Sequence, residues 1–197
     1  SSAHILGHSW TGKLVPIWAK QNPSRLRSLI LVDPFFMGKI PMFLKVLFPL
    51  LFRVLPFVKA MGPFVSYEQG VAQAQELKQY RGWSPFQQQV FKASIEPKPD
   101  GSWGSKFVVQ ARNEIFEDVM RVAGLTEIIE IPTVLIVPEK GLNRSDGQLK
   151  PYKTYLKNLT IRQVPGNHWP FLVEPEEFNR AVEVCLEEQQ QKPSKLE

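Results

Sequence analysis

Residues 3–12 of the chain read AHILGHSWTG, and this stretch decides the fold. A short apolar run stops at Gly7, and a helical pattern of apolar residues begins at Lys13. We therefore expect a strand, a sharp turn and a helix, with Ser9 at the tip of the turn. A serine in such a turn adopts a strained backbone conformation that exposes its hydroxyl, and small residues on either side let the strand and the helix pass each other.

Ser9 is the candidate nucleophile, because Gly7 and Gly12 supply the small residues that this turn needs. The helix that follows points unpaired backbone N–H groups at the space beside Ser9. The N–H of Trp10, directly after the nucleophile, is the candidate donor of an oxyanion hole. Glycine and serine are also common in purely structural turns, so the motif alone leaves that interpretation open.

The stretch resembles the nucleophile elbow of the α/β-hydrolase superfamily. Residues 22–34, NPSRLRSLILVDP, are similar to that family's next helix end, loop and strand. Residues 131–141, IPTVLIVPEKG, are similar to its penultimate strand, and residues 164–186, VPGNHWPFLVEPEEFNRAVEVCL, to its last strand, histidine loop and final helix. The resemblance implies an α/β-hydrolase fold: a mostly parallel sheet flanked by helices, built from residues 1–33 and 126–197, with residues 34–125 inserted as a helical cap.

A serine hydroxyl needs a base within hydrogen-bonding distance before it can act as a nucleophile. The chain has three histidines. His4 lies in the expected strand, and His8 precedes Ser9 with its side chain expected to point elsewhere, so we interpret both as structural. His168 follows a predicted strand in a loop that resembles the family's histidine loop, and it is the predicted base; a surface histidine is the alternative.

The third member of the triad departs from the family's usual pattern. The position that matches the usual acid is Gly141, and glycine cannot orient an imidazole. Asp33 ends a buried strand, a position that a minority of α/β-hydrolases use for the acid, and the carboxyl ends of parallel strands share one edge of the sheet. We therefore favour Asp33, with Asp146 as the alternative acid and Glu139 as a weaker third choice. An Asp-Pro pair is also frequent as a plain turn.

Residues 35–65 combine many Phe, Leu, Val and Met side chains with four basic residues and no acidic one, and prolines divide the segment into short pieces. No uncharged run approaches the roughly 18 residues that a membrane span needs. We interpret the segment as a lid whose apolar face, including Leu47 and Phe52, forms an acyl pocket. A peripheral contact with a membrane surface and an ordinary cap core are the alternatives.

Periodicity and turn residues predict the remaining elements. We expect an irregular connection over 96–106, strands over 28–32, 132–137 and 160–164, and helices over 69–80, 84–95, 109–122, 149–156 and 176–188. Ser84 is the expected N-cap of its helix, with Pro85 at the first helical position.

The composition limits the classes of partner. The 197 residues, 43% of them hydrophobic, suffice for a buried core, and the net charge of +5 is spread without a basic run interleaved with aromatic residues. We expect no nucleic-acid partner, no metal and no cofactor. The single cysteine, Cys185, excludes an intrachain disulfide and fits a reducing compartment, and its helical spacing indicates a core residue.

The two ends of the sequence suggest further expectations. In the resembled fold several strands precede the elbow, so we expect an N-terminal portion, and with it the second oxyanion donor, to be missing from this sequence or supplied by another chain. Residues 194–196, Ser-Lys-Leu, would be a peroxisomal signal at a C-terminus, but Glu197 follows; a final Leu-Glu pair is also a common cloning remnant. We expect an intracellular protein, with the peroxisome as a candidate compartment.

The nucleophile type narrows the chemistry that the resemblance implies. Epoxide and haloalkane hydrolases of this superfamily use a carboxylate nucleophile, whereas Ser9 implies acyl transfer to water. We expect a serine hydrolase that cleaves an ester or thioester of a lipophilic acyl group, similar to fungal-type peroxisomal hydrolases of acyl-CoA or secondary-metabolite intermediates. A non-catalytic hydrolase-like domain that binds or assembles is the alternative, motivated by Gly141 and the missing N-terminal portion.

Overall fold

The computed structural model describes residues 2–35, 37–38 and 61–191. The chain divides into two units, one formed by residues 1–39 and 121–197 and the other by residues 40–120. Most of the predicted lid, including Leu47 and Phe52, lies outside the described residues.

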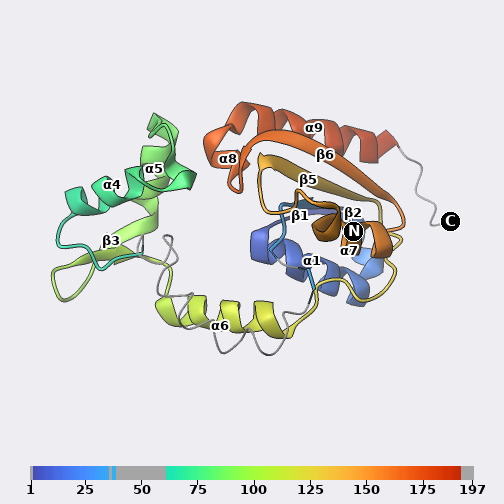
Figure 1. The fold of residues 1–197 in the computed structure, drawn as a ribbon, viewed down its shortest axis with the longest axis horizontal. Coiled ribbons are helices and arrows are strands. Elements are labelled where there is room, and N and C mark those ends of the chain that lie inside the picture. The colour runs from blue at the N-terminus through green and yellow to red at the C-terminus, as the bar shows by residue number, and fades with distance from the viewer. Residues whose placement is uncertain (1, 36, 39–60, 192–197) are drawn as a thin grey trace. The chain divides into compact units, whose positions relative to one another are not determined.

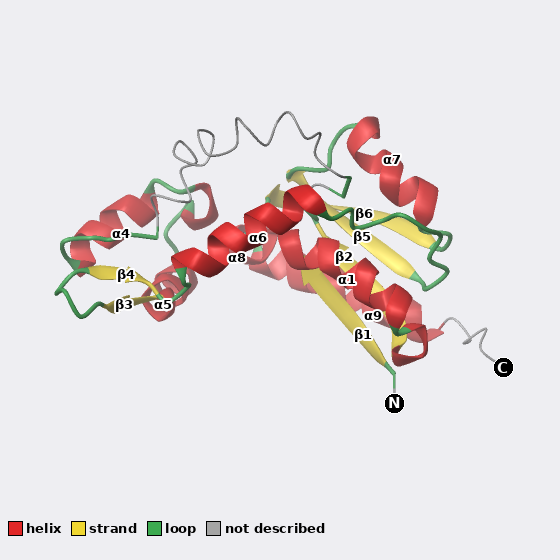
Figure 2. Cartoon of the chain, turned by 90° about the horizontal axis from the view of Figure 1, so that it is seen from below, coloured by secondary structure: helices red, strands yellow, loops and turns green. Residues whose placement is uncertain are grey.

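The first unit is built on a four-stranded parallel sheet. Its strands are β1 (Ala3–His8), β2 (Leu26–Val32), β5 (Thr133–Lys140) and β6 (Leu159–Asn167), in the spatial order β1-β2-β5-β6. All three neighbouring pairs are parallel, and the strands lie side by side in Figure 2. Parallel pairing requires a crossover after each strand, and the sequence supplies helices for this purpose.

Helices cover both faces of this sheet (Figure 1). Leu29 and Leu31 of β2 pack in one cluster with residues of α1 (Ser9–Gln21) and α7 (Asp146–Tyr155). Ile30 and Val32 pack in a second cluster with residues of α9 (Pro175–Gln191), Cys185 among them. Alternate side chains of a strand point to opposite faces, so a sheet covered on both sides requires the continuous apolar run that β2 has.

The parallel arrangement places the functional candidates at one edge of the sheet. Ser9 directly follows β1, Asp33 follows β2, Gly141 follows β5 and His168 follows β6. Since all four strands run in the same direction, the segments after them meet at the carboxyl edge. The topology therefore brings together residues that are up to 159 positions apart in sequence.

The second unit contains three helices and a hairpin among its described residues. The helices are α4 (Tyr67–Gln75), α5 (Pro85–Ser94) and α6 (Val109–Arg121), the last residue of which belongs to the first unit. The hairpin strands are β3 (Ile95–Pro97) and β4 (Trp103–Ser105), and a 3-10 turn, η2 (Lys78–Tyr80), lies between α4 and α5. Its core is an aromatic and aliphatic cluster around the buried Phe64 and Phe91. The structure confirms Ser84 as N-cap of α5 with Pro85 at the first helical position, and Gln87 completes a capping box.

Two expectations about local structure are wrong, and one element was missed. The connection predicted as irregular contains the antiparallel pair β3 and β4, which closes because Gly101 adopts a positive φ in the turn and Trp103 pairs with Phe64. The helix predicted over 69–80 begins earlier and stops at Gln75, since Leu77 is extended and packs against the unit's core. A short helix, α8 (Pro170–Val173), was not predicted.

Within the described residues, every helix is too short or too polar to cross a membrane. 

We expect Ile136→Ala to lower the free energy of unfolding by about 2–5 kcal/mol, because the fully buried side chain is lost from the centre of the sheet. Ile161→Ala on the neighbouring strand is the matched control, and it should cost clearly less because Ile161 is 40% exposed. Chemical denaturation followed by circular dichroism measures both. Equal losses would contradict the assignment of these two positions to the interior and the surface.

Candidate active site

The turn between β1 and α1 has the strained geometry that its sequence predicts. Ser9 has a positive φ of 54°. A Cβ atom on Gly7 would lie 2.8 Å from Val15 Cγ2, and one on Gly12 would lie 2.9 Å from the Gly7 oxygen and 3.0 Å from Pro34 Cγ. Both positions therefore require glycine, and strain of about 1–3 kcal/mol at Ser9 is maintained by the packed elements around it.

Trp10 is the second residue of α1, directly after Ser9. The first four N–H groups of a helix have no partner within that helix, and they carry the positive end of the helix dipole. The backbone oxygen of Ser9 accepts a hydrogen bond from the N–H of Phe35 at 3.0 Å, which ties the turn to the segment after β2. The role of the Trp10 N–H in an oxyanion hole stays a prediction.

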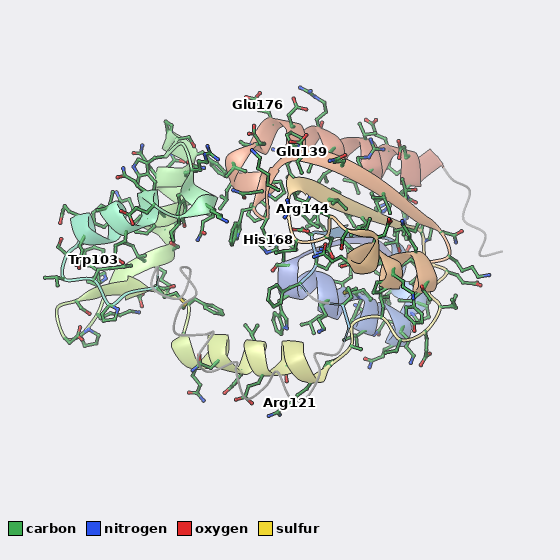
Figure 3. The ribbon with its side chains drawn as sticks, in the orientation of Figure 1. Trp103, Arg121, Glu139, Arg144, His168 and Glu176 are labelled. Carbon is green, nitrogen blue, oxygen red and sulfur yellow. The ribbon has the colours of Figure 1, made fainter. Side chains whose placement is uncertain are left out.

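Ser9, His168 and Asp33 form one chain of hydrogen bonds. Nε2 of His168 lies 2.9 Å from Ser9 Oγ, and Nδ1 lies 2.7 Å from Asp33 Oδ2. A carboxylate can only accept, so Nδ1 carries the proton and Nε2 is left to accept the proton of Ser9. Figure 3 labels His168 in the loop that follows β6. This is the connectivity that an activated serine nucleophile needs.

The carboxylate of Asp33 is completely buried and held by protein donors. The N–H of Leu142 lies 3.0 Å and 2.8 Å from its two oxygens, and Asn143 donates to Oδ1 from its backbone at 3.1 Å and from its side chain at 2.9 Å. Burial by itself raises the pKa of Asp33, but the hydrogen bonds from His168, Asn143 and Leu142 outweigh it and lower the pKa below its usual value. Asp33 is therefore ionised and fixed beside His168.

Gly141 leaves room for the carboxylate of Asp33, which follows β2, beside His168. A Cβ atom at this position would lie 2.6 Å from Asp33 Oδ2 and 2.9 Å from its Cγ. Any side chain at 141 would thus occupy the space that the Asp33 carboxylate fills. The glycine at 141, where the resembled family usually has its acid, therefore leaves the space that the Asp33 carboxylate occupies.

Behind the carboxylate, Asn143 and Tyr152 form a buried polar pair. The side-chain nitrogen of Asn143 also donates to the oxygen of Pro34 at 2.9 Å, and its oxygen accepts from the Tyr152 hydroxyl at 3.1 Å. Burial, and after it the negative charge of Asp33, raise the pKa of the Tyr152 phenol, so it stays a donor. The amide of Asn143 is thereby locked with its nitrogen toward Asp33. Sequence patterns gave no sign of this pair, because neither residue belongs to a motif.

The structure does not bring the other candidate acids to His168, both of whose ring nitrogens are engaged by Ser9 and Asp33. Asp146 is the first residue of α7, with a side chain 97% exposed and an ion pair to Lys153 at 3.1 Å. Glu139 is exposed near the end of β5.

The two remaining histidines, His4 and His8, have different hydrogen-bond partners. Nδ1 of His4 lies 2.7 Å from Ser28 Oγ on the next strand, consistent with a structural role. The expectation that His8 points away from the site is wrong: its Nε2 lies 2.7 Å from the backbone oxygen of His168, and the two rings are 4.7 Å apart. Sequence reasoning missed this contact because β1 and β6 are not neighbours in the sheet.

Among the described residues there is no group of three or more His, Cys, Asp or Glu side chains that could hold a metal ion. Cys185, a residue of α9, is buried in the core.

We expect Asp33→Asn to reduce turnover by about three to four orders of magnitude, because an amide leaves His168 in the wrong tautomer. Asp146→Asn is the control and should leave turnover unchanged, since its exposed ion pair contributes about 1 kcal/mol or less. Steady-state kinetics with an ester substrate, together with circular dichroism to verify folding, measure both effects. Loss of turnover in Asp146→Asn with activity kept in Asp33→Asn would reverse the assignment.

Gly141→Ala should push the Asp33 carboxylate away from His168 and lower kcat by on the order of a hundredfold, as small displacements of catalytic groups do. Gly147→Ala is the matched control, because no atom lies within 4 Å of the added Cβ and the site is on the exposed first turn of α7. It should keep kcat and stabilise slightly. A Gly141→Ala protein with unchanged kcat would contradict the proposed crowding.

The sequence model of the alpha/beta hydrolase fold family matches residues 1–175. One similar solved structure is a marine microorganism esterase, with 21% identity and a TM-score of 0.61; the match covers 92% of this chain and 69% of that one. Another is the peroxisomal alpha-beta-hydrolase Lpx1 from Saccharomyces cerevisiae, with 16% identity and a TM-score of 0.71; the match covers 95% of this chain and 54% of that one. A thioesterase domain from the curacin biosynthetic pathway is also similar, with 16% identity and a TM-score of 0.58; the match covers 92% of this chain and 66% of that one. 

The chain thus spans between 54% and 69% of the length of these three structures. No curated protein matches the sequence. The family match covers most of the chain and agrees with the parallel sheet, the helices on both its faces and the predicted fold class. The protein belongs to the alpha/beta hydrolase fold family.

Proposed function

We propose that the protein is a serine hydrolase that cleaves an ester or thioester through an acyl-enzyme on Ser9. The observation that carries this proposal is the unbroken chain of hydrogen bonds from Ser9 through His168 to the buried Asp33. Family membership supports a hydrolase in general terms. The strained Ser9 at the start of a helix supports the serine as the attacking group.

In the proposed reaction, Nε2 of His168 takes the proton of Ser9 as Oγ attacks the carbonyl carbon of the substrate. The carbonyl oxygen becomes an oxyanion, which the N–H of Trp10 stabilises. Asp33 stabilises the imidazolium that forms. His168 then gives its proton to the leaving alcohol or thiol as the carbon bond to that group breaks, which leaves the acyl group on Ser9.

Water completes the proposed cycle. His168 removes a proton from a water molecule as the water oxygen attacks the acyl carbon, and it returns that proton to Oγ of Ser9 when the second tetrahedral intermediate collapses. The products are a carboxylic acid and the free enzyme. In this proposal the steps use Ser9, His168, Asp33 and the N–H of Trp10, together with one substrate molecule and one water molecule.

We propose a lipophilic acyl group, for which the support is the composition of residues 35–65. We further propose that the second unit is the cap of the enzyme and that basic residues of the segment suit a coenzyme A phosphate or a membrane surface. A similar structure is described as a peroxisomal hydrolase and another as a thioesterase domain. These two descriptions are the support for an acyl-CoA substrate and a peroxisomal location, which we include as proposals.

The serine chemistry is tested with a fluorophosphonate probe, which forms a covalent bond only with an activated serine. We expect intact-protein mass spectrometry to show one adduct on the wild-type protein, located at Ser9, and none on Ser9→Ala. Ser145→Ala is the matched control and should label like the wild type, because Ser145 caps α7 and does not contact His168 in the hydrogen-bonded chain. A folded wild-type protein without the adduct would favour the binding-module alternative.

Turnover of acetyl and long-chain p-nitrophenyl esters and of acyl-CoAs then ranks the substrate classes. We expect a higher kcat/KM for the longer acyl chains. The same kcat/KM for acetyl and long-chain esters would contradict the lipophilic preference while leaving the serine chemistry in place.

A further inference from the structure

His8 is the last residue of β1 and the N-cap of α1, yet its side chain makes no hydrogen bond to the helix that it caps. Its Nε2 instead lies 2.7 Å from the backbone oxygen of His168. A carbonyl oxygen can only accept, so Nε2 of His8 must carry a proton and donate it to this bond. The residue before the candidate nucleophile is thereby bonded to the backbone of the candidate base.

Ring contacts support the same connection. The His8 ring packs against the His168 ring at 4.7 Å between centroids and meets Phe171 edge-on at 4.9 Å. Phe171 belongs to α8, directly after the histidine loop, and packs at 5.8 Å against Phe178 of α9. His8 thus contacts the histidine loop at the base itself and at the short helix that follows it.

His8 is uncharged at neutral pH, which suits its position beside the candidate base. The titratable groups that face it are His168, from the loop after β6, and Asp33, from the end of β2. Burial, and next the proximity of His168, lower the pKa of His8 to about 4, against the smaller opposing effects of the backbone hydrogen bond and of Asp33. His8 is therefore neutral at pH 7, and it adds no positive charge beside an imidazolium on His168.

We propose that His8 is a positioning residue, whose Nε2–H bond to the backbone oxygen of His168 holds that imidazole in line with Ser9 Oγ. His8 does not itself exchange a proton with the substrate. This inference rests on the proposed acyl transfer at Ser9. It adds a third connection to the two that hold His168, the bonds of its ring to Ser9 and to Asp33.

Two substitutions separate the hydrogen bond from ring packing. His8→Phe keeps a planar ring and removes the donor, whereas the side-chain nitrogen of His8→Gln can donate from nearly the same place. We expect His8→Phe to lower kcat for an ester about tenfold to a hundredfold with little change in KM, and His8→Gln to recover most of the loss. His4→Gln, on the same strand and bonded to Ser28, is the matched control and should keep kcat. Activities are normalised to the folded fraction from circular dichroism.

Equal losses in His8→Phe and His8→Gln would mean that the ring, not the donor, matters, and they would overturn the proposal. Wild-type kcat in His8→Phe would overturn it as well. 

A measurement on the wild-type protein does not depend on any variant. With 15N-labelled histidine, NMR should show His8 as the neutral Nε2–H tautomer at pH 7, and it should become protonated only as the pH falls toward 4. A neutral His8 that carries its proton on Nδ1 would contradict the proposal even if both variants failed to fold, because its Nε2 could then not donate to the backbone oxygen of His168.

NMR also separates this inference from the proposed function. The proton that His168 Nδ1 shares with Asp33 should give a low-field signal in the wild type and in His8→Gln, and the signal should weaken or shift in His8→Phe. This result can be obtained whether or not the wild-type protein hydrolyses an ester. Absence of Ser9 labelling would defeat the proposed hydrolase, whereas an unchanged low-field proton in His8→Phe would defeat only the role of His8.

Discussion

The burial of one carboxylate, that of Asp33, governs the arrangement of the site. A charge removed from water costs several kcal/mol unless protein groups replace its hydration. Here the replacement comes from the N–H groups of Leu142 and Asn143, the side chain of Asn143 and Nδ1 of His168. Hydrogen bonds to a charged group contribute about 1.5–3 kcal/mol each, so this set of donors can offset the cost. If one donor were lost, the carboxylate would be left incompletely solvated.

That requirement connects three strand ends that are distant in sequence. Asp33 follows β2, its backbone donors follow β5, and His168 follows β6. Gly141 has no Cβ, and the chain after β5 can therefore approach the carboxylate closely enough for the next two N–H groups to reach it. Tyr152 on α7 fixes the orientation of the Asn143 amide. Hydrogen bonds made within the core thus hold the carboxylate to which the candidate base is bonded.

The nucleophile side of the site depends on close packing. Gly7 and Gly12 bring the end of β1 and the start of α1 together, and Gly12 also lies against Pro34, the residue after the acid. The Ser9 oxygen is bonded to Phe35, one residue further along. Serine and acid are therefore carried by neighbouring strand ends that touch each other, and His8 connects the same turn to the histidine loop. A packed arrangement of this kind can maintain the positive φ of Ser9.

The sequence by itself determined the elements that depend on local patterns. The continuous apolar run of β2 predicted a buried parallel strand, the small residues around Ser9 predicted a strained turn, and Ser84-Pro85 predicted the start of α5. Residues 39–60 of the predicted lid lie outside the described part of the chain. Only the tertiary structure shows that Asp33, and not Asp146, lies beside His168, because the parallel sheet brings the end of β2 to the histidine loop and Gly141 leaves space for the carboxylate. The same holds for the Asn143–Tyr152 pair and for His8, whose partners are distant in sequence and come close only when the strand ends meet at one edge of the sheet.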